Sequence, residues 1–190
     1  MSEIFVFGGS NGSGKSTIAT RFLSSINPSP EFVNADIIAA QLNPDDVDAV
    51  AIKASRIMLD RLRVLAEQNL LFAFETTLAA RSFARFLREC KNKEYTVNLI
   101  YVWLNSPELA VSRVAKRVAA GGHDIPTDAI VRRYQRGLNN LFDLYLPLAD
   151  RWIVYDNSNQ TTKIAEKPIV QPIVIYQPDT WQNILDSTNL

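Results

Sequence analysis

The 190-residue chain is poor in cysteine, in net charge and in long hydrophobic runs. Cys90 is its single cysteine, which excludes an intramolecular disulfide framework and a four-cysteine zinc site. This cysteine content is typical of proteins from a reducing compartment. Twenty basic residues balance twenty acidic ones, so no overall charge attracts the chain to nucleic acid or to an anionic membrane. A nucleic-acid partner is therefore disfavoured unless a local basic patch supplies the attraction.

The first apolar run, residues 4–7, ends at a glycine after four residues. A secretory signal needs a basic start and a longer apolar segment. No run approaches the roughly 20 apolar residues of a membrane-spanning helix. These absences predict a cytoplasmic protein with no membrane partner. Apolar residues still make up 47% of the chain, enough to form a core rather than a disordered ensemble.

Short apolar runs alternate with helical patterns along the first 155 residues. The strands are expected at residues 4–7, 32–34, 70–74, 96–104 and 152–155. The helices are expected at residues 15–25, 37–42, 47–68, 80–91, 107–120 and 127–144. This alternation predicts an α/β fold with a parallel sheet of about five strands and helices on both faces.

Residues 1–190 are expected to form one domain, because nothing in the sequence marks a linker between two. The two helices within residues 107–146, separated by a glycine pair, are expected to form a helical lid. The tail, residues 159–190, contains three prolines and is expected to pack on the core. It is predicted to form an edge hairpin or an extended segment, with a last short helix near residues 179–185.

Residues 9–16, GSNGSGKS, match the phosphate-binding pattern G-x-x-x-x-G-K-[ST] at every fixed position. Glycines let backbone N–H groups wrap a phosphate, and the following helix adds its dipole and free donors. The fold is therefore expected to be of the P-loop NTPase type. The residues expected to bind ATP are Gly9, Ser10, Asn11, Gly12, Ser13, Gly14, Lys15, Ser16 and Thr17. Lys15 is expected to bridge the β- and γ-phosphates, and the Ser16 hydroxyl to hold Mg²⁺.

Two other classes of P-loop protein are disfavoured by missing motifs. The guanine-reading string N-K-x-D is absent, and residues 92–95 lack its aspartate. No predicted strand ends in the paired acidic residues typical of a motor ATPase. Instead, one acidic residue follows each of two predicted strands, Asp36 and Glu75. Ligands of open α/β sheets bind at this edge, so the pattern favours a small-molecule kinase.

Each of these acidic residues has two interpretations. Asp36 can accept the proton of an acceptor hydroxyl as a general base, or it can cap the helix that begins after it. Glu75 can contact the acceptor, or it can form a structural ion pair with an arginine. The second alternative arises because burying an unpaired charge costs several kcal/mol.

A basic cluster flanks the glycine pair at residues 121–122. Its members are Arg113, Lys116, Arg117, Arg132, Arg133 and Arg136. In kinases, arginines of such a helical hairpin close on the transferring phosphoryl group and neutralise its charge. The alternative is a solvated basic face on two helices. His123, the single histidine, is interpreted as shaping this loop by a hydrogen bond rather than as a base.

Several strings in order resemble the zeta toxin family of P-loop kinases. They are GGSNGSGKST at residues 8–17, NAD at 34–36, FETTL at 74–78 and RVAKRVAAGGHDIP at 113–126. RRYQRGLNNL at 132–141 and YDNS at 155–158 extend the resemblance to nearly the whole chain up to about residue 158.

The resemblance implies an ATP- and Mg²⁺-dependent kinase that phosphorylates a hydroxyl of a UDP-amino sugar, since family members act on UDP-N-acetylglucosamine. An antitoxin protein is the partner that it implies. The catalytic residues that it implies are Asp36, Arg117 and either Arg132 or Arg133. The P-loop lysine, Lys15, completes the catalytic set. The acceptor-binding residues that it implies are Asp36, Glu75, Thr77 and Arg81.

The chain also departs from the larger members of that family. Ala79 and Ala80 precede Arg81, where larger members carry an arginine closer to the Glu-x-Thr string. The chain is also short, which leaves little room for a sugar-nucleotide pocket. Three alternatives therefore stay open: a kinase of a nucleic-acid end, a kinase of an antibiotic hydroxyl, and an ATP-dependent binding module without catalysis. The presence of both Asp36 and Glu75 disfavours the binding module.

Overall fold

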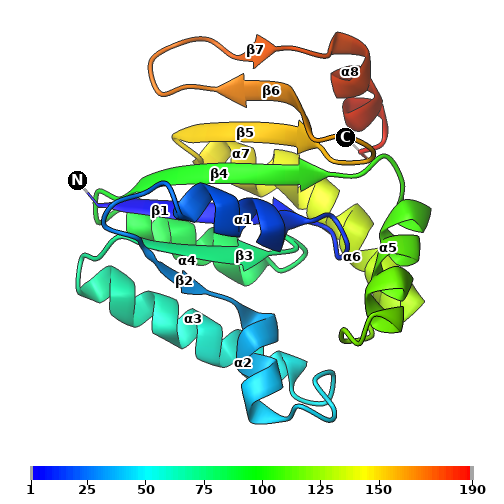
Figure 1. The fold of residues 1–190 in the computed structure, drawn as a ribbon. Helices are drawn as coiled ribbons and strands as arrows, with labels where there is room; N and C mark the ends of the chain where they lie inside the picture. The colour runs from blue at the N-terminus through cyan, green and yellow to red at the C-terminus, as the bar shows by residue number, and fades with distance from the viewer. Residues whose placement is uncertain (1, 189–190) are drawn as a thin grey trace.

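The computed structural model describes residues 2–188, in which seven strands form one sheet with helices on both faces (Figure 1). The strands are β1 (Glu3–Gly9), β2 (Glu31–Val33), β3 (Phe72–Thr76), β4 (Thr96–Trp103), β5 (Arg151–Asp156), β6 (Thr162–Lys167) and β7 (Val174–Ile175). The helices are α1 (Lys15–Leu23), α2 (Ala35–Leu42), α3 (Ala51–Glu67), α4 (Arg81–Lys91), α5 (Pro107–Ala119), α6 (Thr127–Asn140), the π-helical turn η1 (Leu141–Tyr145), α7 (Leu146–Leu148) and α8 (Pro178–Asp186). None of these helices is long and apolar enough to cross a lipid bilayer.

The strand order is β2-β3-β1-β4-β5-β6-β7, and the first five strands pair in parallel. The predicted α/β fold with a largely parallel sheet is thus confirmed. The tail adds β6 and β7 as antiparallel edge strands beyond the expected five, so the edge hairpin and the last short helix predicted for the tail are confirmed. β7 pairs through only two residues, and so short a segment carries no readable alternation of apolar and polar side chains.

The central strands β1, β3 and β4 are almost entirely buried, as continuous apolar runs in parallel sheets generally are. Alternate side chains of β1 face opposite layers. Phe7 packs with Ala19 and Leu23 of α1 on one face. Val6 belongs to the larger core on the other face, which α4 covers with side chains such as Phe86. Figure 1 shows α1 in front of the sheet and α4 and α6 behind it.

The tail packs on the sheet through aromatic side chains. Trp181 of α8 stacks on Trp152 of β5, with ring centroids 5.8 Å apart and planes inclined by 10°. Phe142 of η1 contacts the same tryptophan ring of α8 at 5.6 Å. These contacts join α8 to the sheet face that α4 and α6 cover.

Several helix boundaries differ from the sequence-based expectation, and each difference has a local cause. Asn34 caps α2 by accepting the Asp36 backbone N–H at 2.7 Å, so the interpretation of Asp36 as the cap is wrong. α3 begins at Ala51, because residues 47–50 form turns. α6 begins at Thr127, where it was expected. Ser106 caps α5, since its hydroxyl accepts the backbone N–H of residue 109 at 3.1 Å.

Candidate active site

The phosphate-binding loop between β1 and α1 requires glycine at two positions for reasons of both conformation and space. Gly12 and Gly14 have φ angles of +74° and +85°, which only glycine adopts readily. A Cβ atom on Gly14 would lie 2.6 Å from Nδ2 of Asn157. That amide donates a hydrogen bond of 2.7 Å to the Ser13 carbonyl and so holds the loop from the end of β5. Sequence reasoning missed this role of Asn157, although the YDNS string drew attention to the segment.

The loop contains buried polar atoms that are not satisfied within the described residues. The hydroxyls of Ser10 and Ser13 and the amide oxygen of Asn11 have no hydrogen-bond partner in residues 2–188. Buried polar groups are normally hydrogen-bonded, so unpaired ones at a surface loop indicate a ligand or water that would pair with them. Two free hydroxyl donors beside a left-handed glycine turn at a helix N-terminus fit a bound phosphate. The residues present therefore suit the nucleotide that the motif implies.

The ammonium group of Lys15 lies in the same loop. Its side chain is buried, and its Nζ lies 3.4 Å from the Ser10 carbonyl oxygen and 3.9 Å from Glu75 Oε1. Glu75, the last but one residue of β3, is 5% exposed, and its Oε2 atom has no partner in the described chain. The alternative interpretation of Glu75, a structural ion pair with an arginine, is thus wrong in its partner, which is a lysine. A carboxylate held at this depth by one long ion pair is costly, which is typical of functional sites.

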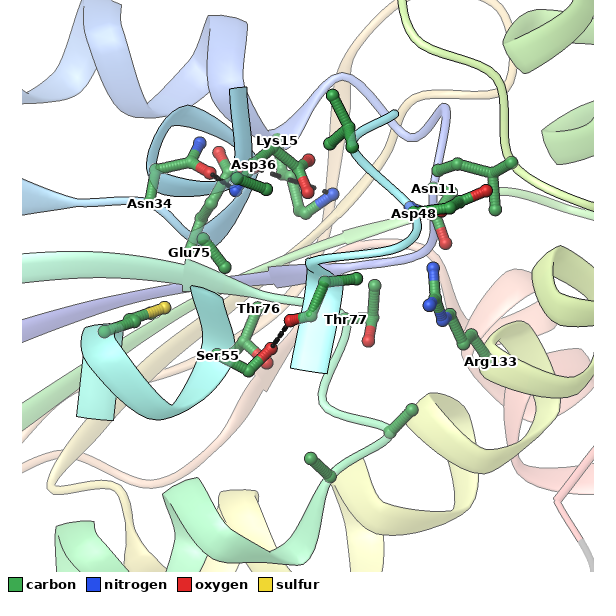
Figure 2. A pocket seen from close by; sticks show the side chains of 18 of the residues that line it. Asn11, Lys15, Asn34, Asp36, Asp48, Ser55, Glu75, Thr76, Thr77 and Arg133 are labelled. Atoms are coloured by element: carbon green, nitrogen blue, oxygen red, sulfur yellow. Dashed lines mark hydrogen bonds and ion pairs between the residues drawn. The ribbon is translucent and has the colours of Figure 1, made fainter. Parts of the chain in front are cut away.

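A cavity of about 450 Å³ opens beside the loop at the carboxyl edge of the sheet (Figure 2). Its charged lining residues are Lys15, Asp36, Asp48, Glu75, Arg132, Arg133 and Arg136. Thr76 and Thr77 supply hydroxyls, and Met58 and Phe83 belong to its apolar part. In Figure 2, Lys15, Asp36 and Glu75 lie together, and Arg133 points into the cavity from the opposite side.

Asp36 stands in the first turn of α2, and α2 begins directly after β2. The side chain lines the cavity, and no residue from 2 to 188 forms an ion pair or hydrogen bond with its carboxylate. The backbone N–H of Asp36 is fixed by Asn34, so the position of the residue is set independently of its side chain. This arrangement leaves the carboxylate free to accept a proton or a hydrogen bond from a ligand.

The three arginines of α6 that line the cavity differ in their partners. Arg132 forms an ion pair with Asp128 at 3.0 Å, whereas Arg133 and Arg136 have no ion pair within residues 2–188. Sequence reasoning left Arg132 and Arg133 as alternatives. The structure places both at the cavity and adds Arg136, which the basic cluster contained but the resemblance did not single out.

Two arginines from the sequence-based set lie outside this cavity. Arg117 donates a hydrogen bond of 2.9 Å to the backbone carbonyl of His123 and so supports the loop between α5 and α6. Arg81 lines a second, smaller hollow of about 350 Å³ together with Arg136, Asn139, Asn140 and Asp143. The structure therefore does not bring Arg117 or Arg81 to the residues that meet at the main cavity.

His123 and Asp48 meet at the rim of the cavity, where the imidazole Nε2 lies 3.4 Å from Asp48 Oδ1. The contact joins the loop between α5 and α6 to the turn that precedes α3. It agrees with the loop-shaping role expected for His123. Sequence reasoning missed Asp48, because nothing in the turn at residues 44–48 distinguishes an acid at the cavity from one in solvent.

Few of the described residues could bind Mg²⁺. Ser16 is exposed in the first turn of α1, next to Lys15. Within the described residues, no group of three or more histidine, cysteine, aspartate or glutamate side chains could form a protein cage for a metal ion. Mg²⁺ usually keeps waters and shares phosphate ligands, so one hydroxyl beside the phosphate loop fits this ion.

Comparison with known proteins agrees with this geometry. Residues 4–140 match the family model AAA_33, an AAA domain. An uncharacterized protein of Haemophilus influenzae is 31% identical over 126 residues, which are 66% of this chain and 88% of that protein.

Solved structures show the same fold at low sequence identity. A chain of the AvrRxo1-ORF1:-ORF2 complex with ATP superposes with a TM-score of 0.78 at 13% identity. The match covers 100% of this chain but only 65% of that one. A chain of the PezAT chromosomal toxin–antitoxin system of Streptococcus pneumoniae gives 0.62 at 16% identity and covers 98% and 85% of the two chains. These similarities show a P-loop kinase-like fold.

Proposed function

Since the chain belongs to this AAA domain family, we propose that it is an ATP-dependent kinase that transfers the γ-phosphoryl group to a hydroxyl of a small molecule. The observation that carries the proposal is the meeting of Lys15, Asp36, Glu75 and Arg133 at one cavity beside the phosphate loop. A pure nucleotide-binding module needs no free carboxylate at the place where an acceptor would lie. A volume of about 450 Å³ suits a small acceptor rather than a nucleic-acid end.

Each residue has a role that follows from its position. The amides of residues 9–17 and the ammonium group of Lys15 bind the phosphates. Asp36 accepts the proton of the acceptor hydroxyl, or orients that hydroxyl toward the phosphorus atom. Arg133 offsets the negative charge on the transferring group, because no carboxylate of residues 2–188 pairs with its guanidinium.

Glu75 keeps the Lys15 ammonium oriented across the end of the loop. Together with the Thr77 hydroxyl, it also presents polar groups to the acceptor, since both residues line the cavity. Mg²⁺, when bound through the Ser16 hydroxyl and phosphate oxygens, supplies further positive charge to the phosphates.

We further propose that the kinase is of the zeta toxin type, with a UDP-amino sugar as acceptor and an antitoxin protein as partner. The ordered strings at residues 34–36, 74–78 and 113–126 support this proposal, as does the shared fold with a chain of a toxin–antitoxin system. The acceptor would enter between α2 and α6, where Asp36 and Arg133 face each other across the cavity.

The test is transfer of labelled γ-phosphate from ATP, with Mg²⁺, to a panel of hydroxyl acceptors headed by UDP-N-acetylglucosamine. Lys15→Ala is the blank, because it removes the cation that contacts the phosphates. Asp36→Asn keeps the shape of the side chain and is expected to lower the transfer rate by at least about 100-fold while nucleotide binding is retained. Full transfer by the Asp36→Asn variant would disprove the role of Asp36. Transfer to another hydroxyl, but to no UDP-sugar, would disprove only the acceptor class.

A further inference from the structure

The loop formed by the last residue of β3 and the four residues after it, residues 76–80, has an unusual backbone. Leu78 has a φ angle of +60° and is completely buried. Left-handed conformations are unfavourable for a side chain with a Cβ atom, so the surrounding structure must impose this one. The hydroxyl of Thr76 contributes by accepting the Leu78 N–H at 3.1 Å.

Helix α6 and the turn η1 hold the same loop by its carbonyl groups. The Asn140 side-chain amide donates a hydrogen bond of 2.8 Å to the Leu78 carbonyl, and the Tyr145 hydroxyl donates one of 2.7 Å to the Ala80 carbonyl. A Cβ atom on Gly137 would lie 2.3 Å from the Thr77 carbonyl oxygen, so the two backbones touch there. The Asn140 side chain is buried, and its bond is therefore shielded from competing water.

The other side of the loop contacts the phosphate-binding strand. A Cβ atom on Gly8 of β1 would meet Cδ1 of Leu78 at 2.9 Å, so the leucine side chain fills the space beside that glycine. Thr77, Ala79 and Ala80 line the main cavity from this loop. The loop is therefore clamped between the strand that leads into the phosphate loop and the helix that carries Arg133.

We infer that Asn140 is a positioning residue for the acceptor site, an inference that rests on the proposed kinase function. The same helix presents Arg133 to the cavity and, two turns later, fixes the carbonyl next to Thr77 through Asn140. The distance between the phosphoryl-stabilising cation and the acceptor-facing hydroxyl is set by this bond. A misplacement of about 1 Å at a reacting group is enough to slow an enzyme on the order of 100-fold.

The test compares Asn140→Asp with Asn139→Asp. The two variants carry the same change on adjacent residues, but the Asn139 side chain bonds only to Gln135 in the described chain. An ionised Asp at position 140 cannot donate to the Leu78 carbonyl, whereas a protonated one can. Transfer to the acceptor found with the wild-type protein is measured from pH 5 to pH 8, with each variant's rate divided by the wild-type rate at the same pH.

We expect the Asn140→Asp rate ratio at pH 8 to fall by about 10- to 100-fold and to recover as the pH is lowered toward 5. The Asn139→Asp ratio is expected to stay near one throughout, and nucleotide binding is expected to be unchanged in both. An Asn140→Asp ratio near one at pH 8, or a loss that does not depend on pH, would overturn the inference. A loss explained by unfolding would show as reduced nucleotide binding as well.

Hydrogen exchange separates this inference from the kinase proposal. At pH 8, the backbone amides of residues 76–80 should exchange faster in Asn140→Asp than in Asn139→Asp, while those of residues 9–17 should not differ. Unchanged exchange at residues 76–80 would refute the inference even if no acceptor were found. Absence of transfer by the wild-type protein, with the exchange difference present, would count against the kinase proposal alone.

Discussion

The replacement Gly14→Ala tests the geometry of the phosphate loop most directly, because two separate costs can be read from the structure. The φ angle of +85° at Gly14 disfavours any residue with a Cβ atom, at about 1–2 kcal/mol. The added methyl group would also lie 2.6 Å from Nδ2 of Asn157. Relief of that clash requires the amide to leave the Ser13 carbonyl, which costs about 1 kcal/mol for the lost hydrogen bond.

Gly121 provides the matched control. Its φ angle is +86°, but a Cβ atom there would meet nothing within 4 Å. Gly121→Ala should therefore lower the free energy of unfolding by about 1–2 kcal/mol, and Gly14→Ala by about 2–3 kcal/mol. The difference between the two variants isolates the cost of the contact with Asn157.

Urea unfolding followed by tryptophan fluorescence measures both values, with the slope of the transition as a check on two-state behaviour. The contact argument also predicts non-additivity, because Asn157→Ala should remove the extra cost of Gly14→Ala. Equal destabilisation by Gly14→Ala and Gly121→Ala would refute the contact argument. Losses below about 0.5 kcal/mol in both variants would refute the strain argument.

Three further predictions concern single side chains. Burial raises the pKa of the Cys90 thiol to about 12. A thiol reagent at pH 8 should therefore label Cys90 in the native protein only as fast as the protein unfolds. Labelling faster than unfolding would contradict this prediction. Burial alone would raise the pKa of Asp150, but hydrogen bonds from Lys91 and from a backbone N–H hold it below its ordinary value. The ionised Asp150 carboxylate therefore stabilises the fold above about pH 4. Asp150→Asn should lower the free energy of unfolding by about 1–2 kcal/mol at pH 7, and by progressively less as the pH falls below about 4. Unfolding measured as a function of pH checks this. Arg133→Ala should lower the rate of phosphoryl transfer by at least tenfold. It should not lower the melting temperature, because the Arg133 guanidinium has no protein partner among the described residues. A smaller loss of rate than that caused by Arg132→Ala would contradict the role of Arg133 at the phosphoryl group.

Side-chain orientation on the basic helices could not be predicted from the sequence. Arg117 and Arg133 both lie in the basic cluster flanking the glycine pair, yet only Arg133 lines the cavity, whereas Arg117 supports a loop carbonyl. Which side of a helix faces a cavity depends on how the whole helix packs against distant segments. For α6 that packing includes Gly137 against the Thr77 carbonyl, a contact between residues 60 positions apart in the chain.

The starts of α2 and α3 were predicted less well than those of α1, α5 and α6. Asp36 was open to interpretation as a cap because aspartate is a good capping residue, but Asn34, two positions earlier, takes that role. The competition between neighbouring capping residues is decided by where β2 ends, and β2 is only three residues long. The outcome matters for function, because it leaves the Asp36 carboxylate free to face the cavity.

By itself, the sequence determined the phosphate-binding loop, the parallel α/β architecture and the two acids at the carboxyl ends of β2 and β3. These features depend on contiguous residues: the spacing of glycines, apolar runs of strand length, and the rule that chain segments leaving parallel strands meet at one edge. Only the tertiary structure decided that Lys15 pairs with Glu75, that Arg133 rather than Arg117 reaches the cavity, and that Asn140 clamps the loop at Leu78. Such contacts join residues up to about sixty positions apart, and their geometry arises from the packing of whole helices and strands rather than from any local pattern.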